Sequence, residues 1–121
     1  MRAVVLRTHG GPEVLTIEEV DDPTPGRDDI VVDVEHTAIN RADILQRMGM
    51  YPDPRNRSVE IPGLEFAGVV SAVGADVIGW SVGDRAMGIE AGGCYAGKVV
   101  THARQALPVP ASVASADAAA I

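Results

Sequence analysis

The fold is decided by residues 30–48, which read IVVDVEHTAINRADILQRM. In the first nine residues, apolar and polar side chains alternate. One side of the expected strand carries Ile30, Val32 and Val34, continued by His36 and Ala38, and the other carries Asp33, Glu35 and Thr37. A period of two residues predicts a half-buried β-strand over Ile30 to Ala38. The period then changes, because Ile44, Leu45 and Met48 recur at helical spacing, which predicts a helix of about two turns.

Short strands are also expected on both sides of this stretch. The candidate ranges are 1–6, 15–20, 66–73, 83–88 and 95–102. The chain has 13 Gly and 8 Pro among 121 residues, above the average share of about 12%, and they separate the apolar segments. This pattern predicts a mainly β fold, a partly open β-barrel with a few short helices.

The C-terminal residues turn helical after Leu107-Pro108-Val109-Pro110. Ser112 or Ser115 would serve as the N-cap of a helix that runs into Ile121. A helix this short is marginal without packing partners, so we expect more sequence to follow.

Charge and composition exclude several partners. Ten Lys and Arg stand against 17 Asp and Glu, giving a net charge of -7, which disfavours nucleic acid and anionic membranes. The sequence has one cysteine, so it forms no internal disulfide, and it contains no apolar run of 18 residues. We therefore expect a cytoplasmic protein.

Two motifs resemble functional sites but fit plainer explanations better. Residues 92–98, GGCYAGK, match the glycine and lysine spacing of a P-loop, but Val99 follows where a hydroxyl is required, so we expect a turn into a strand. The three histidines lie far apart in the sequence and Cys94 has no cysteine partner, so no local zinc motif exists. Cys94 is expected to be a buried thiol rather than a nucleophile.

The segment Asn40-Arg41-Ala42-Asp43 lies between the expected strand and helix and has two interpretations. Asn40 is a good N-cap, and Asp43 three residues later completes a capping-box-like pair. Alternatively, the segment and the following Gly49-Met50-Tyr51-Pro52 face one functional cleft. Spacing alone gives the two interpretations equal weight.

A wider resemblance bears on this choice. The Asn-Arg-Ala-Asp segment, Gly-x-Tyr-Pro, Ile61-Pro62-Gly63-Leu64-Glu65-Phe66-Ala67-Gly68 and Val82-Gly83-Asp84-Arg85 occur in that order. Together they resemble the medium-chain dehydrogenase/reductase superfamily over essentially the whole chain. The likeness is greatest to its zinc-independent NADPH:quinone oxidoreductases, of the p53-inducible and zeta-crystallin-like types. Residues 1–121 are then similar to the N-terminal, GroES-like catalytic domain, without the dinucleotide-binding domain.

The resemblance also implies that no catalytic zinc is bound. Zinc alcohol dehydrogenases carry a cysteine at the position of Asn40 and a histidine at that of Leu64, and only Glu65 remains of that ligand set. Neither an amide nor a leucine replaces those ligands. Quinones and conjugated enones need a metal less than simple ketones do, because they delocalise the charge that hydride transfer creates.

The implied activity is hydride transfer from NADPH to a quinone or related conjugated carbonyl. By resemblance, Asn40 and Tyr51 would donate hydrogen bonds to the reacting groups, and Asn40 and Arg41 would lie near the cofactor. Asp43 would mainly hold the helix start, with a role as proton carrier as the alternative, and Glu65 would anchor a turn. NADPH would be bound mainly by the missing domain, so the isolated chain is expected to be inactive and the full-length protein to be a homo-oligomer.

Two other functions stay open. An enoyl-thioester reductase of the same superfamily would share this fold. A GroES-like binding or assembly module without catalysis would need a long mobile loop, and the only candidate, Tyr51 to Ser58, is short and contains proline.

Overall fold

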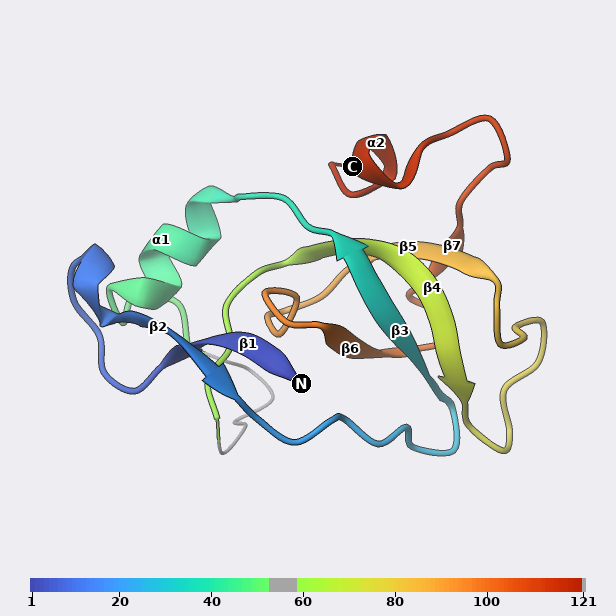
Figure 1. Cartoon of the computed structure of the whole chain (residues 1–121), viewed down its shortest axis with the longest axis horizontal. Coiled ribbons are helices and arrows are strands. Elements are labelled where there is room, and N and C mark those ends of the chain that lie inside the picture. The colour runs from blue at the N-terminus through green and yellow to red at the C-terminus, as the bar shows by residue number, and fades with distance from the viewer. Residues whose placement is uncertain (53–58, 121) are drawn as a thin grey trace.

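The computed structural model describes residues 1–52 and 59–120, and its strands lie in two antiparallel sheets (Figure 1). A hairpin pairs β1 (Arg2–Leu6) with β2 (Leu15–Glu19) after the short 3-10 helix η1 (Pro12–Val14). The larger sheet has the order β6-β3-β4-β5-β7. Its strands are β3 (Asp29–His36), β4 (Glu65–Val73), β5 (Arg85–Ile89), β6 (Lys98–His102) and β7 (Leu107–Pro108). The expected mainly β fold is confirmed, with open sheets rather than a closed barrel in the described residues.

Strand β3 is central because it pairs with β4 on one side and β6 on the other. Its first half is buried, and Ile30 and Val32 have no exposed surface. The prediction that His36 continues the apolar side is wrong, because His36 is exposed. A register irregularity between Val34 and His36 breaks the alternation there, as a β-bulge does.

The main core forms between β3, β4 and the strands beside them. Phe66 is the largest side chain that is fully buried, and it packs in one cluster with residues of four strands. The buried members are Ile30, Val32, Phe66, Val70, Ala86, Cys94, Val99 and Ala106.

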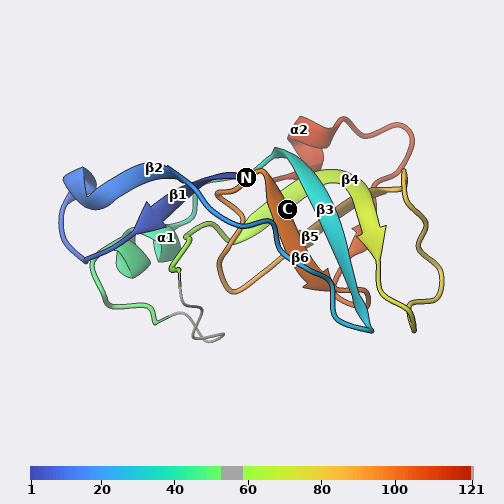
Figure 2. The same ribbon diagram turned by 60° about the horizontal axis from the view of Figure 1, so that its bottom comes forward.

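The C-terminal segment differs from the prediction in two ways. Residues 107–108 form the edge strand β7, a position where a proline removes no needed hydrogen bond. Helix α2 (Ser115–Ala118) begins after Ala114, so neither Ser112 nor Ser115 is its N-cap. Ser115 instead faces Arg85, whose Nη2 lies 3.3 Å from its Oγ. Figure 2 shows α2 packed beside β4, where Ala118 and Ala119 bury against Ala67.

Helix α1 (Arg41–Arg47) follows β3 and lies beside the turn of the β1–β2 hairpin (Figure 1). The backbone N–H of Gly10 in that turn donates to the carbonyl of Arg47 at 2.9 Å. Glu60 links the same elements, since its carboxylate contacts both His9 Nε2 at 2.9 Å and Gln46 Nε2 at 3.2 Å. The last turn of α1 is thereby held against the hairpin turn and the segment that precedes β4.

Candidate functional site

Asn40 is the N-cap of α1, as the capping interpretation predicts. Its backbone is extended, with φ -115° and ψ 155°, and its N–H donates to Oδ2 of Asp43 at 2.7 Å. Asp43 is only 6% exposed. A carboxylate in the first turn of a helix is favoured both by the free N–H groups and by the helix dipole. The capping-box pair of Asn40 and Asp43 is confirmed, and the role of Asp43 at the site stays a prediction.

A tyrosine that the sequence analysis did not single out completes this arrangement. The hydroxyl of Tyr95 donates to the same Oδ2 of Asp43 at 2.7 Å, and the carbonyl oxygen of Ala38 lies 3.3 Å away. Burial raises the pKa of Tyr95 well above its ordinary value, and the hydrogen bond to Asp43 and the charge of that carboxylate raise it further. The phenol therefore stays protonated and donates to Asp43 throughout the physiological pH range.

Several polar atoms around α1 are buried without a hydrogen-bond partner in the described part of the chain. They are Asn40 Nδ2, Asp43 Oδ1, Gln46 Oε1 and Arg47 Nε. Buried donors without a partner are uncommon and call for an explanation, such as a ligand that binds there. The backbone N–H of Asn40 donates to Asp43, whereas the side-chain Nδ2 remains available to donate to another group.

The other two residues expected at the site, Arg41 and Tyr51, differ in exposure and in position relative to α1. Arg41 is exposed at the first position of α1, and Tyr51 is half-buried in the bend that follows the helix. Within residues 1–52 and 59–120, no hydrogen bond joins Tyr51 to Asn40. The role of Tyr51 therefore stays a prediction. Residues 53–58 of the candidate mobile loop lie outside the described residues.

Leu64 and Glu65 lie where the chain enters β4. Glu65 is buried, at 7% exposed, and its backbone carbonyl accepts a 2.6 Å hydrogen bond from the Thr37 hydroxyl. Among the described residues, no group of three or more His, Cys, Asp and Glu side chains is placed to hold a metal ion.

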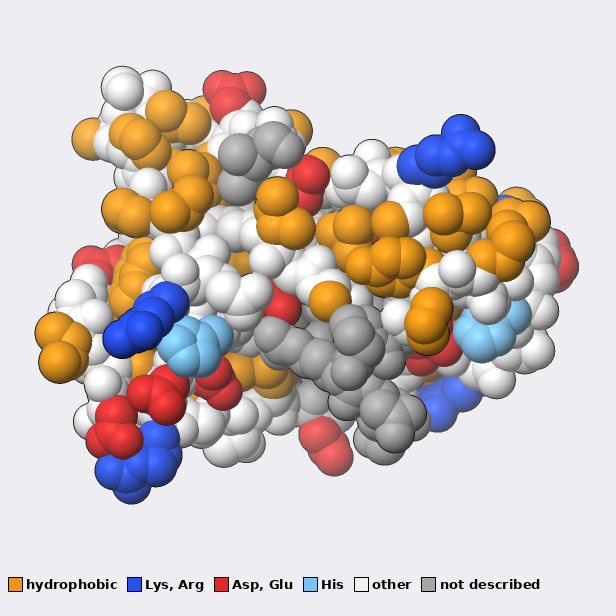
Figure 3. All heavy atoms as spheres, turned by 180° about the vertical axis from the view of Figure 1, so that it is seen from behind, with side chains coloured by type: hydrophobic (Ala, Val, Ile, Leu, Met, Phe, Trp, Pro, Cys, Tyr) orange, Lys and Arg blue, Asp and Glu red, His pale blue; other side chains and the backbone are white. Residues whose placement is uncertain are grey.

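Tyr95 and Ile39 border two hollows in the surface. One, of about 270 Å³, also touches Asp43, Ile44 and Arg47 on α1, and the other, of about 530 Å³, reaches to Cys94. Figure 3 shows hydrophobic side chains gathered over the α1 end of the molecule on one face. The exposed large hydrophobic residues on and next to α1 are Ile39, Ile44, Met48 and Met50. Apolar walls with a few polar atoms are typical of sites for small organic molecules.

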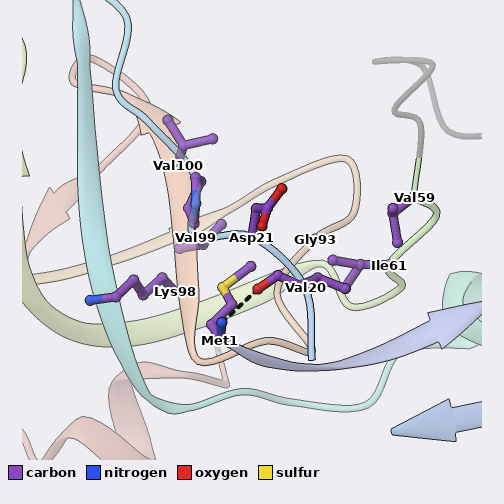
Figure 4. Close-up of a pocket in the computed structure, with 10 residues that line it drawn as sticks. Met1, Val20, Asp21, Val59, Ile61, Gly93, Lys98, Val99 and Val100 are labelled. Atoms are coloured by element: carbon purple, nitrogen blue, oxygen red, sulfur yellow. Dashed lines mark hydrogen bonds between the residues drawn. The ribbon is translucent and has the colours of Figure 1, made fainter. Parts of the chain in front are cut away.

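A third hollow lies away from α1, and no residue of that helix lines it (Figure 4). It has a volume of about 400 Å³ and opens between β1, the end of β2 and β6. Met1 is held at its wall, where the terminal nitrogen donates to the carbonyl of Val20 at 2.6 Å. No residue of the Asn40, Asp43 and Tyr95 cluster lines it.

The glycine-rich segment before β6 is a turn into a strand, as predicted. Gly92 and Gly93 have positive φ angles of 129° and 95°, and Lys98 is the first residue of β6. Its ammonium pairs with Asp33 at 2.6 Å. Cys94 is fully buried, which agrees with the expected buried thiol. The described part of the chain contains no helix long and apolar enough to cross a membrane.

Comparison with known proteins assigns the family. Residues 26–111 match the model of the alcohol dehydrogenase GroES-like domain. The chain therefore belongs to this family, which places it among the oxidoreductases of the medium-chain dehydrogenase/reductase superfamily.

Related sequences come from reductases and from larger enzymes. The chain is 40% identical over 116 residues to a mycocerosic acid synthase-like polyketide synthase of Mycobacterium tuberculosis, covering 96% of this chain and 6% of that protein. It is 35% identical over 89 residues to the acryloyl-coenzyme A reductase of Sulfurisphaera tokodaii, covering 74% of this chain and 25% of the reductase. The chain thus spans a minor part of the relatives it matches.

Solved structures show the same fold. The Escherichia coli quinone oxidoreductase complexed with NADPH has a TM-score of 0.91 at 34% identity, covering 99% of this chain and 36% of that one. The quinone oxidoreductase of Pseudomonas syringae pv. Tomato DC3000 has a TM-score of 0.92 at 33% identity, with 98% and 36% covered. The expected likeness to the quinone oxidoreductases is confirmed.

Proposed function

We propose that this chain is the acceptor-binding domain of an NADPH-dependent reductase that transfers hydride to quinones or related conjugated carbonyls without zinc. The observation that carries this proposal is the buried, unpartnered Nδ2 of Asn40 at the N-cap of α1, the helix whose residues Asp43, Ile44 and Arg47 line an apolar hollow. A side-chain amide is a neutral donor, suited to an oxygen that gains negative charge during the reaction. The two quinone oxidoreductase structures support the same acceptor class.

The residues expected at the site fit this chemistry better than zinc chemistry. Leu64 offers no metal ligand, and the carboxylate of Asp43 is taken up by the Asn40 N–H and the Tyr95 hydroxyl. NADPH, when bound, would supply the hydride. The residues of this chain would hold the acceptor, exclude water with the apolar face over α1, and donate a hydrogen bond from Asn40. Because the chain covers about a third of the quinone oxidoreductases, we expect the isolated domain to be inactive.

Reduction of an enoyl thioester is the second candidate function. It is favoured by the 40% identity to a polyketide synthase and by the match to acryloyl-coenzyme A reductase. An α,β-unsaturated thioester is also a conjugated acceptor, and its carbonyl oxygen would take the same amide donor. The two candidates differ in what the acceptor carries beyond the conjugated carbonyl.

The deciding experiment assays the full-length gene product with NADPH against ortho- and para-quinones and against crotonyl and acryloyl thioesters. We expect quinone reduction that a zinc chelator does not inhibit, and a fall in kcat of about a hundredfold in Asn40→Ala. The exposed Gln105→Ala is the matched control and should keep wild-type activity. Turnover of thioesters alone would select the second candidate, and activity that depends on added zinc would overturn the proposal.

A further inference from the structure

We propose that Tyr95 is a positioning residue for the reductase site, acting on Asn40 through the carboxylate of Asp43. The inference rests on the proposed function and adds to it a residue that lies more than fifty positions away from Asn40 in the sequence. It starts from one shared atom. Oδ2 of Asp43 accepts hydrogen bonds from both the Tyr95 hydroxyl and the Asn40 backbone N–H, each at 2.7 Å.

The position of Tyr95 is itself firmly determined. Its N–H donates to the carbonyl of Pro62 at 2.9 Å, and its carbonyl accepts from the N–H of Val4 at 2.8 Å. The ring packs against Gly63, where an added Cβ would come within 2.8 Å of the ring atom Cγ. Tyr95 is therefore anchored by β1 and by the segment before β4, and its hydroxyl projects to the start of α1.

Asp43 depends on Tyr95 for its orientation. Its Oδ1 has no partner in the described residues, so the hydrogen bonds that hold this carboxylate all converge on Oδ2. Loss of the Tyr95 hydroxyl would leave the backbone N–H of Asn40 as the remaining hydrogen-bond donor to the Asp43 carboxylate. The carboxylate would then be free to rotate toward its other oxygen, and the N-cap would loosen.

The phenol is suited to positioning and not to proton transfer. Its single proton is committed to Asp43, and its oxygen also faces the carbonyl of Ala38, which follows β3. The hydroxyl thus restrains the Asp43 end of residues 38–43, the segment that carries Asn40. An amide held in place by such restraints is preorganised for the charge that forms on the acceptor.

The kinetic experiment is a double-mutant cycle in the full-length enzyme. We expect Tyr95→Phe to lower kcat about tenfold with little change in the KM for NADPH, because misplaced catalytic groups affect the chemical step. In the Asn40→Ala background, Tyr95→Phe should have no further effect on kcat. Thr16→Val is the control, since its hydroxyl contacts the Glu18 carboxylate at 2.9 Å and the Val5 carbonyl at 3.2 Å within the β1–β2 hairpin, and it should leave kcat unchanged.

A spectroscopic readout tests the same inference without activity. In 15N NMR spectra, Tyr95→Phe should shift both the backbone and the side-chain amide signals of Asn40 and speed hydrogen exchange of its backbone N–H. Thr16→Val should leave these signals in place. Unchanged Asn40 signals, or equal fold-losses of kcat from Tyr95→Phe with and without Asn40, would overturn the positioning role. An enzyme that reduces no quinone or thioester but shows the NMR shift would refute the proposed function alone.

Discussion

The backbone of Gly68 on β4 lies directly against the backbone carbonyl of Asp33 on β3. A Cβ added at Gly68 would overlap the Asp33 carbonyl oxygen, and it would approach the Glu35 nitrogen to 3.1 Å. These are backbone atoms at the irregular part of the β3–β4 ladder, so they cannot move aside like a flexible side chain. We predict that Gly68→Ala lowers the free energy of unfolding by about 1–3 kcal/mol, measured by chemical denaturation.

Gly97→Ala is the control for this prediction. The nearest atom to its added Cβ is the carbonyl oxygen of Arg2 at 3.7 Å, an ordinary contact. Its stability should stay within about 0.5 kcal/mol of the wild type. Equal losses in the two variants would mean that general glycine effects, and not the contact with Asp33, set the cost.

Sequence patterns predicted much of the fold because most strands carry their own signals. Alternation identified β3, and glycine punctuation separated β4, β5 and β6. The sequence patterns predicted the structure incorrectly where tertiary contacts determine which residues are buried and where an element begins. The bulge beside Gly68 exposes His36, β7 has only two residues, and α2 begins after Ala114 while Ser115 contacts Arg85.

The site was predictable in part for the same reason. The Asn40 and Asp43 pairing is local, so spacing predicted it, and the structure confirms the capping arrangement. Tyr95 joins the pair across 52 positions, and no periodic pattern reports such a contact. Gly63, which packs against the ring of Tyr95, lies in the segment 61–68 of the family resemblance, and Tyr95 lies in the glycine-rich turn before β6.

Arg85 ties the segment before α2 to the sheet. Its Nη2 donates to the carbonyl of Val113 at 2.7 Å, and its Nη1 lies 3.4 Å from the carbonyl of Pro110. We predict that Arg85→Met costs about 1–3 kcal/mol of stability, since hydrogen bonds from a charged donor are lost. Hydrogen exchange should speed up at the amides of Ala118 and Ala119 in α2. Unchanged exchange there would show that burial against Ala67, and not Arg85, holds the helix.

The Asp33 and Lys98 pair should make stability depend on pH. The hydrogen bond from Lys98 lowers the pKa of Asp33, helped by Ser71, and the same bond raises the pKa of Lys98. The contribution of Asp33 is present above its unfolded pKa of about 3.9 and is lost as pH falls through its lower folded value. The contribution of Lys98 is present below its unfolded pKa of about 10.4 and is lost as pH rises through its higher folded value.

We therefore predict that Asp33→Asn is less stable than the wild type at pH 7 and that the difference closes in acid. The loss should be small, because the Asp33 side chain is 53% exposed, and smaller still at high salt. Thermal unfolding across pH 2 to 10 measures it. In the double variant with Lys98→Met, the two losses should not add, and full additivity would show that the pair contributes nothing.

Cys94 should react with thiol reagents only when the protein opens. Its side chain is fully buried in the main core beside Phe66 and Val99. Since a reagent must reach the sulfur, we expect native protein to label slowly and the rate to rise with denaturant along the unfolding curve. The control is Ser112→Cys in a Cys94→Ala background, which places a thiol at an exposed position and should label within seconds to minutes. Rapid labelling of Cys94 in the native protein would mean that the larger hollow beside Tyr95, of about 530 Å³, opens far enough to admit the reagent. Cys94 would then line that hollow as well as belonging to the core.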